Sequence, residues 1–241
     1  MTQFFGSLSN YPGNTGTYYY SKFFEEYKYQ AEYNALGVKD LSLGISDLIS
    51  KGYKGFSLSM PFKQEIIDHL EVSDSLCQKY KSCNTVLIKN STLHGFNTDI
   101  YGVYRVVKEI PVDNKVVVLG NGCIGKMFAS YLEHMGLNFK VFAPSLANWD
   151  ERHIASTVII NCTPFGTANT KSPLESLIGI NKVFDLTFNG KELAKQSSKV
   201  EYYSGVFFYK EVFLQQFQLY TGIIADPDMF NYFTTKRKKL N

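Results

Sequence analysis

The most regular hydrophobic pattern along the chain lies in its second half. Lys115–Leu119 (KVVVL) is a continuous apolar run of the length typical of a strand buried in a parallel sheet. Behind it, apolar side chains recur at the spacing of one helix face, which predicts an amphipathic helix ending at Gly136. That face consists of Ile124, Met127, Phe128, Tyr131, Leu132 and Met135. Strands that alternate with helices in this way predict parallel pairing with right-handed crossovers.

Shorter patterns divide the rest of the chain. Three more strands are predicted in the second half, over residues 139–143, 157–160 and 183–187. The tail from Val212 is predicted to be helical, and the change of character places a domain boundary near residues 101–114. The first hundred residues mix strand and helix signals. A strand opens at Phe4-Phe5 and ends in a loop over residues 6–16, and two helices follow, over 19–36 stopped by Gly37 and over 43–50 stopped by Gly52. Next come a strand over 55–60 ended by Pro61, helical residues 64–70, a strand over 85–88 and a turn at Asn90-Ser91.

Composition narrows the class of protein. The chain has 241 residues, of which 44% are hydrophobic and 20% charged, so it can bury a core as one large domain or two small ones. No apolar run approaches the ~20 residues that a membrane span needs. The N-terminus has neither a basic start nor an apolar core of signal-peptide length. We therefore expect a cytoplasmic protein without a membrane partner.

Charge and cysteine usage argue against two further classes. The net charge is only +3, and the basic cluster at residues 236–239 (KRKK) is interpreted as a solvated tail, so no nucleic-acid partner is expected. The cysteines form no C-x-x-C pair and no histidine stands near enough to suggest zinc, so we expect reduced thiols and no metal site. The four are Cys77, Cys83, Cys123 and Cys162.

The sharpest local motif is G-x-G-x-x-G at Gly120, Gly122 and Gly125. Glycines there permit a tight turn, let the backbone approach a pyrophosphate and allow close packing of helix on strand. Its place between a buried strand and an amphipathic helix favours a dinucleotide site over an ordinary glycine-rich turn. The next strand ends at residues 143–145 (APS), which hold neither the acidic residue typical of NAD sites nor the arginine typical of NADP sites. These residues alone leave the cofactor open.

Three polar residues in the first half stand at the ends of predicted elements. Lys63 follows a strand on a turn that Pro61 forces, Asn84 precedes another strand, and Asp99 opens a helix. Sites in α/β proteins are built at such ends. Taken singly, each residue also has an ordinary structural interpretation, as a surface charge, a turn former and a helix cap respectively.

Together with the glycine loop, these residues resemble a known family. The ordered motifs S-x-S-x-P-x-K, N-T, G-F-N-T-D, G-x-G-x-x-G, N-C-T-P-x-G and a strand ending in aspartate resemble those of the shikimate dehydrogenases, over residues 4–222. The resemblance implies an α/β fold of three parts. These are a small substrate-binding α/β domain over residues 1–102, a Rossmann-type NADP-binding domain with a doubly wound parallel sheet over 103–211, and C-terminal helices over 212–241 that return to the first domain. A monomer or a homodimer is expected.

The same resemblance implies an activity and a set of roles. The family reduces 3-dehydroshikimate to shikimate with NADPH in aromatic amino-acid biosynthesis. Its paired lysine and aspartate fall on Lys63 and Asp99, its substrate-binding asparagine on Asn84, and a motif threonine on Ser59. Hydride delivery to a carbonyl leaves an alkoxide, which a positioned lysine ammonium can protonate. The implied cofactor contacts are Gly120, Asn121, Gly122, Cys123, Ile124, Gly125, Ser145, Thr163 and Gly205.

Three positions depart from the family pattern. Thr15 and Thr17 stand in place of the first-loop serines whose hydroxyls hold the substrate carboxylate. Val212 stands in place of a substrate-binding glutamine, so we expect Gln215, or else Gln216, to supply that contact from the next turn. The family's N-R-T signature after the second strand of the nucleotide domain is missing.

These departures leave alternatives open. A dehydrogenase acting on quinate or another cyclic hydroxy acid fits the altered recognition residues. A non-catalytic nucleotide-binding relative is also conceivable, although the intact Lys63, Asn84 and Asp99 argue against it. The expected cofactor is NADP with NAD not excluded, because no acidic residue stands at the strand end to repel a phosphate.

Overall fold

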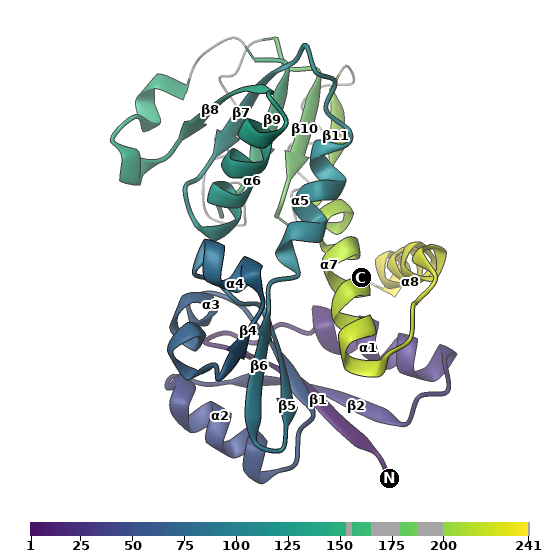
Figure 1. Ribbon diagram of the computed structural model, residues 1–241. Helices are drawn as coiled ribbons and strands as arrows, with labels where there is room; N and C mark the ends of the chain where they lie inside the picture. Colours follow the sequence, from purple (N-terminus) through teal and green to yellow (C-terminus); the bar gives the residue numbers. More distant parts are fainter. Residues whose placement is uncertain (153–155, 165–178, 188–199, 241) are drawn as a thin grey trace. The chain divides into compact units, whose positions relative to one another are not determined.

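The computed structural model describes residues 1–152, 156–164, 179–187 and 200–240, and its chain forms two compact units (Figure 1). The first unit consists of Met1–Thr98 together with Val212–Asn241, and the second of Asp99–Glu211. The division at Asp99 comes before the predicted boundary at residue 102. Helix α7 (Gly205–Thr221) begins in the second unit and ends in the first.

A six-stranded mixed sheet forms the centre of the first unit. Its strand order is β2-β1-β3-β5-β6-β4. Strands β1 and β2, β1 and β3, and β4 and β6 run parallel, whereas β5 is antiparallel to both of its neighbours. The strands are β1 (Gln3–Ser9), β2 (Ala31–Gly37), β3 (Gly55–Leu58), β4 (Val72–Ser73), β5 (Thr85–Lys89) and β6 (Thr92–Phe96).

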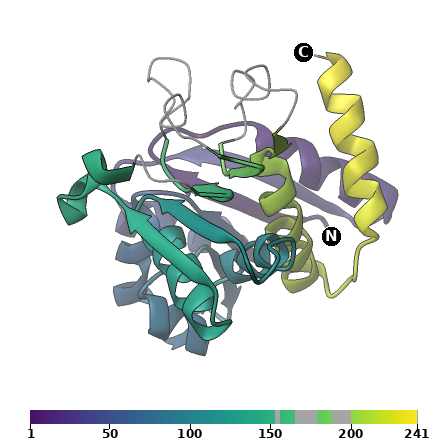
Figure 2. The same cartoon turned by 90° about the horizontal axis from the view of Figure 1, so that it is seen from above.

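Helices cover both faces of this sheet. Alternate side chains of a strand point to opposite faces, so each face contributes its own side chains to the packing. Leu8 of β1 joins the core under α2, whereas Phe5 of the same strand packs against Tyr220 of α7, with ring centroids 4.9 Å apart. Figures 1 and 2 both show α8 beside α1. The helices of this unit are α1 (Thr15–Glu26), α2 (Leu41–Ser50), α3 (Phe62–Glu65) with a 3₁₀ turn over Ile66–His69, α4 (Ser75–Tyr80), the second part of α7, and α8 (Pro227–Leu240).

The second unit is built on a parallel sheet, as the apolar runs predict. The five strands lie in the order β11-β10-β9-β7-β8, and every pair is parallel. The predicted α/β fold class is therefore confirmed. Its elements are α5 (Asp99–Val107), β7 (Lys115–Leu119), α6 (Cys123–His134), β8 (Asn138–Phe142), 3₁₀ turns over Pro144–Leu146 and Trp149–Arg152, β9 (Val158–Asn161), β10 (Lys182–Asp185) and β11 (Glu201–Tyr203).

Two sequence predictions for the first unit are wrong. The predicted helix over residues 19–36 ends at Glu26, and Ala31–Gly37 forms β2, which pairs with β1 along its whole length. The chain reverses at Lys28, which adopts a φ of 51° without the glycine or proline that would mark a turn in the sequence. Strand β1 also continues past Gly6, where an added Cβ would lie 2.8 Å from the Asn34 carbonyl oxygen of β2.

Candidate active site

Lys63 and Ser59 both follow strand β3 in the first unit. Lys63 lies in α3 and is only 9% exposed, whereas Ser59 is exposed at the strand end. The Lys63 carbonyl accepts a hydrogen bond of 2.7 Å from the N–H of Cys83. The Leu58 N–H in turn donates to the Asn84 carbonyl at 2.9 Å. The segment from the end of β3 to α3, which carries Lys63, is thus fastened to the start of β5, beside Asn84.

Asn84 is 2% exposed, and its side-chain amide is oriented by three donors. Its Oδ1 accepts from the Thr98 N–H at 2.8 Å, the Thr98 hydroxyl at 3.0 Å and the Thr85 hydroxyl at 2.9 Å. A buried polar group with several partners is held in one orientation. The same bonds fasten Thr98, the residue immediately before Asp99, to strand β5.

Asp99 is the first residue of α5 and of the second unit, and it is 1% exposed. A carboxylate in the first turn of a helix is favoured by the free N–H groups and by the positive end of the helix dipole. The sequence prediction of a helix start at Asp99 is therefore confirmed.

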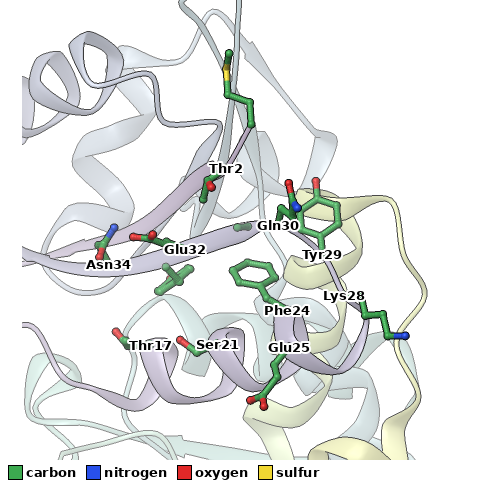
Figure 3. Close-up of a pocket in the computed structure, with 13 residues that line it drawn as sticks. Thr2, Thr17, Ser21, Phe24, Glu25, Lys28, Tyr29, Gln30, Glu32 and Asn34 are labelled. Carbon is green, nitrogen blue, oxygen red and sulfur yellow. The ribbon is translucent and has the colours of Figure 1, made fainter.

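The two threonines of the first loop open α1, at its first and third positions. The Thr15 hydroxyl accepts a hydrogen bond of 3.1 Å from Nη2 of Arg237 in α8. Thr17 instead lines a cavity of about 800 Å³ between α1 and the edge strand β2. In Figure 3, Thr17 and Ser21 face Glu32 of β2 across this cavity. Ser59, Lys63 and Asn84 do not line it.

The glycine loop of the second unit lies between β7 and α6. Gly120 has a φ of 101°, in the left-handed region that glycine adopts without a steric penalty. A Cβ on Gly125 would lie 2.1 Å from the Gly120 carbonyl oxygen, so the helix can approach the turn this closely only with glycine there. A Cβ on Gly122 would meet nothing within 4 Å. The first and third glycines are therefore required by the turn, while the second leaves open space.

That open space lies at the N-terminus of α6. Gly122 is the residue before the helix and no side chain caps it. The N–H groups of Cys123, Ile124 and Gly125, which begin the helix, have no intrahelical acceptor. Such a terminus is suited to the negative charge of a phosphate. Asn121 also belongs to this loop, at its half-buried edge.

A buried polar network joins the ends of β9 and β10. Thr163 donates to Oδ1 of Asn161 through its N–H at 3.1 Å and through its hydroxyl at 2.6 Å. Nδ2 of Asn161 donates to Asp185 at 3.0 Å, and the Tyr202 hydroxyl donates to the same carboxylate at 2.8 Å. Burial and the charge of Asp185 raise the pKa of Tyr202, which keeps its hydroxyl protonated. A Cβ on Gly120 would meet the Thr163 methyl at 3.1 Å, so this network also supports the glycine loop.

The remaining predicted cofactor residues occupy ordinary positions. Ser145 is exposed in the 3₁₀ turn after β8, and Gly205 begins α7. A Cβ on Gly205 would lie 2.7 Å from the Leu186 carbonyl oxygen. Arg152 ends the 3₁₀ turn Trp149–Arg152, which follows β8, and no local pattern indicates this arginine. Its guanidinium stacks on Trp149, with 4.7 Å to the ring centroid, and donates to the Trp149 carbonyl at 2.7 Å.

Other classes of site leave no trace in the described part of the chain. There, no three histidine, cysteine, aspartate or glutamate side chains gather as metal ligands would. No helix among the described residues has the length and apolarity that crossing a bilayer requires. All four cysteines are free thiols.

Known proteins resemble this chain in family model, in sequence and in structure. Residues 17–86 match the family model of the shikimate dehydrogenase substrate binding domain. A shikimate dehydrogenase (NADP(+)) of Clostridium beijerinckii is 27% identical over 206 residues, which cover 73% of this chain and 76% of that protein. A shikimate dehydrogenase-like protein of Haemophilus influenzae is 27% identical over 145 residues, and these span only 54% of its length. The crystal structure of a chorismate mutase/shikimate 5-dehydrogenase fusion protein from Clostridium acetobutylicum has a TM-score of 0.84 and 21% identity, covering 99% of this chain and 98% of that one.

The chain is similar to shikimate dehydrogenases, by the family model over residues 17–86 and by sequence over 206 residues to a relative that is 27% identical. Helix α7 carries Val212 at the position where the resemblance implies a substrate-binding glutamine. Val212 is buried, and Gln216, one turn later, uses its whole amide within the protein. Its Nε2 donates to the Thr85 hydroxyl at 2.9 Å and to the Asn84 carbonyl at 3.3 Å, and its Oε1 accepts from Tyr20 at 2.9 Å. The side chain of Gln215 makes no hydrogen bond within the described residues. Gln216 therefore supports Asn84, while Gln215 remains the predicted substrate contact.

The two glutamines are expected to respond differently to substitution. Gln216→Leu should lower the free energy of unfolding by about 1–3 kcal/mol, because it deprives buried polar groups of a partner. The matched variant Gln215→Leu should change it by less than about 0.5 kcal/mol, as is typical of a side chain without such bonds. Urea denaturation followed by circular dichroism measures both. Equal stability of the two variants would contradict the assignment of Gln216 to the Asn84 network.

One further pair was missed because its strand was predicted as a helix. The Tyr33 hydroxyl of β2 is hydrogen-bonded to the hydroxyl of Ser57, which belongs to the S-x-S-x-P-x-K motif. Burial raises the pKa of Tyr33 to about 12, so this phenol stays protonated at neutral pH. No local signal identifies Tyr33, because its partner lies on another strand.

Proposed function

We propose that this protein is a shikimate dehydrogenase that reduces 3-dehydroshikimate to shikimate with NADPH, in the cytoplasm, as a monomer or homodimer. The observation that carries the proposal is the junction at the start of β5. There the N–H of Cys83 donates to the Lys63 carbonyl. The side chain of the next residue, Asn84, accepts from the N–H of Thr98. Both lie in the region that matches the family's substrate binding domain.

In this proposal the first unit binds the substrate and the second binds the cofactor. Ser59 and Asn84 hold ring hydroxyls, Thr15 and Thr17 take the carboxylate, and Gln215 adds a contact from α7. The cofactor lies on residues 120–125, with Ser145, Thr163 and Gly205 completing its site. NADPH, when bound, supplies the hydride. A substrate of this kind needs several polar partners, because each buried hydroxyl left unpaired costs ~1–3 kcal/mol.

The proton is the part of the reaction that the protein itself supplies. Carbonyl reduction places negative charge on the former carbonyl oxygen. The Lys63 ammonium stabilises that charge and donates the proton, as a general acid. The resemblance gives Asp99 the role of carboxylate partner to this lysine. In the reverse direction Lys63 accepts the hydroxyl proton, so the same group serves as general base.

The buried Val212 supports a second candidate, a dehydrogenase of quinate or a related cyclic hydroxy acid. Valine offers no hydrogen bond where the family has an amide. Discrimination between substrates that differ in the position of their hydroxyl groups is therefore weaker at Val212. A spectrophotometric assay at the nicotinamide absorbance, with shikimate and quinate each tested against NADP and NAD, separates the candidates. Faster turnover of shikimate supports the first. Higher kcat/KM for quinate supports the second, and no turnover of either contradicts both.

The cofactor preference is expected to be real but small. NADP should be favoured over NAD by about tenfold in kcat/KM, since one or two exposed charge-assisted contacts contribute ~1–2 kcal/mol. The nearby cations on the loop side are Lys126 and Lys140, both exposed, and Arg152 is already engaged with Trp149. Exposed charges are screened by salt, so the preference should shrink between low and high ionic strength. A preference of many thousandfold that ignores salt, or a clear preference for NAD, would contradict this expectation.

A further inference from the structure

The basic C-terminal cluster is not simply a solvated tail, because one of its members reaches the first loop. Arg237 lies on α8, and its Nη2 donates to the Thr15 hydroxyl across 222 residues of sequence. Its guanidinium also lies over the rings of Tyr18 and Tyr19, at 5.3 Å and 5.8 Å from their centroids. The cation is thus placed at the first turn of α1.

Helix α8 is held firmly enough to fix this position. The ring of Tyr19 stacks on Phe230, with centroids 4.3 Å apart and planes 6° from parallel. The Tyr19 hydroxyl is hydrogen-bonded to Thr234 at 2.8 Å, and the Tyr18 hydroxyl donates to the Phe233 carbonyl at 3.0 Å. A guanidinium whose stem and ring contacts are fixed loses little freedom when it binds a ligand.

The charge of Arg237 has no counter-ion in the described part of the chain. No acidic side chain there lies within ion-pair distance of it. Its hydrogen bond to the Thr15 hydroxyl uses one of the five N–H groups of a guanidinium. The planar fork of an arginine matches a carboxylate, which can accept two parallel hydrogen bonds.

We propose that Arg237 binds the carboxylate of the substrate together with Thr15. This inference rests on the proposed function, because it concerns the carboxylate of the same cyclic hydroxy acid. When the Thr15 oxygen accepts from Arg237, its own O–H is left to donate to an anion. The N-terminus of α1, a helix of 12 residues, adds its positive dipole end at the same place. The added cation compensates for recognition contacts that threonine and Val212 weaken.

A purely structural role for Arg237 is the competing explanation, and a carboxylate-specific measurement separates the two. Calorimetry gives the Kd of shikimate and of its uncharged methyl ester for the wild-type protein, Arg237→Met and Lys236→Met. Methionine keeps the apolar stem and removes the charge. Lys236→Met is the matched control, because it removes the same charge one residue away. The Lys236 ammonium lies over the Tyr232 ring, 4.4 Å from its centroid.

Arg237→Met should weaken shikimate binding by about 10- to 100-fold, as expected for a lost charge-assisted bond. Lys236→Met should stay within about twofold of the wild type, and the methyl ester should bind all three proteins alike. Equal losses for the acid and the ester, or no loss beyond that of Lys236→Met, would overturn the proposal. If Arg237→Met fails to fold, Arg237→Lys tests the same point: the acid-selective loss should persist in smaller form, and its absence would overturn the proposal.

The outcome is separable from that of the proposed function. A wild-type protein that binds shikimate through Arg237 but does not oxidise it with either cofactor contradicts the enzyme and supports the carboxylate contact. Oxidation of shikimate by the wild-type protein, matched by an equal rate in Arg237→Met, supports the enzyme and overturns the contact. Failure of the wild-type protein to bind shikimate overturns both.

Discussion

Lys63→Ala is expected to reduce turnover of shikimate by ~10²–10⁴-fold, the usual contribution of a general acid or base. The side chain is largely buried, and its backbone is fastened to Cys83, so alanine leaves the surrounding hydrogen bonds of the main chain in place. The loss should therefore appear in kcat, while the affinity for NADP, whose proposed contact residues lie in the second unit, should stay near the wild-type value. Steady-state kinetics and a cofactor titration measure the two effects separately.

A matched control for Lys63→Ala is Lys89→Ala. Lys89 is exposed at the end of β5 that is far from Asn84. Its substitution therefore removes the same charge without touching the bonds between Lys63, Cys83 and Asn84. Its kcat should stay within about twofold of the wild type. Thermal melts establish that Lys63→Ala is folded at the assay temperature, and added primary amine should restore part of its turnover. Near-wild-type turnover in a folded Lys63→Ala protein would remove the lysine from the mechanism.

Local patterns were sufficient where neighbouring residues alone determine the structure. The strand Lys115–Leu119 has the bounds that its apolar run predicts, because a strand buried on both faces has no polar face to interrupt the run. Gly52 and Gly136 end their helices with φ values of 75° and 68°, in the region that glycine favours. In each of these cases the information lies within a few residues.

Patterns were insufficient where the partner strand decides the structure. Residues 31–37 carry enough spaced apolar side chains to pass for the end of a helix, and only pairing with β1 makes them a strand. Strand β6 was overlooked although the turn before it, Asn90-Ser91, was recognised and has positive φ at both residues. The sequence of β6, TLHGF, is too polar and glycine-containing to indicate a strand without its pairing to β5.

The candidate site shows the same limit at longer range. Lys63, Asn84 and Asp99 were identified because each stands at the end of an element. Asn84 is supported from α7, where Gln216 reaches Thr85 across 131 residues, and the first-loop Thr15 is bound from α8, where Arg237 reaches it across 222. No local pattern in one sequence connects positions so far apart, and only the packing of these helices on the first unit brings them together.

Gly122→Val is expected to weaken NADP binding by at least about 100-fold, which corresponds to about 2.7 kcal/mol. Gly122 has a φ of −74°, which valine adopts, and a Cβ there would meet no protein atom within 4 Å. The protein itself can therefore accept the side chain. A branched side chain would fill the volume in front of the helix N-terminus, where a pyrophosphate would approach the N–H groups of α6.

The choice of Gly122 decides what the experiment can show. Substituting Gly125 would force a Cβ to within 2.1 Å of the Gly120 carbonyl oxygen, so a loss of binding there would report only a distorted turn. At Gly122 the only expected cost to the fold is a poorer helix cap, at most ~1 kcal/mol, which a thermal melt can verify. Gly13→Val is the matched control, since a Cβ at Gly13 also meets nothing within 4 Å and lies in the first unit. Undiminished NADP affinity in folded Gly122→Val would mean that this loop is a tight turn without a phosphate, whereas a loss confined to Gly122→Val places the pyrophosphate at the α6 terminus.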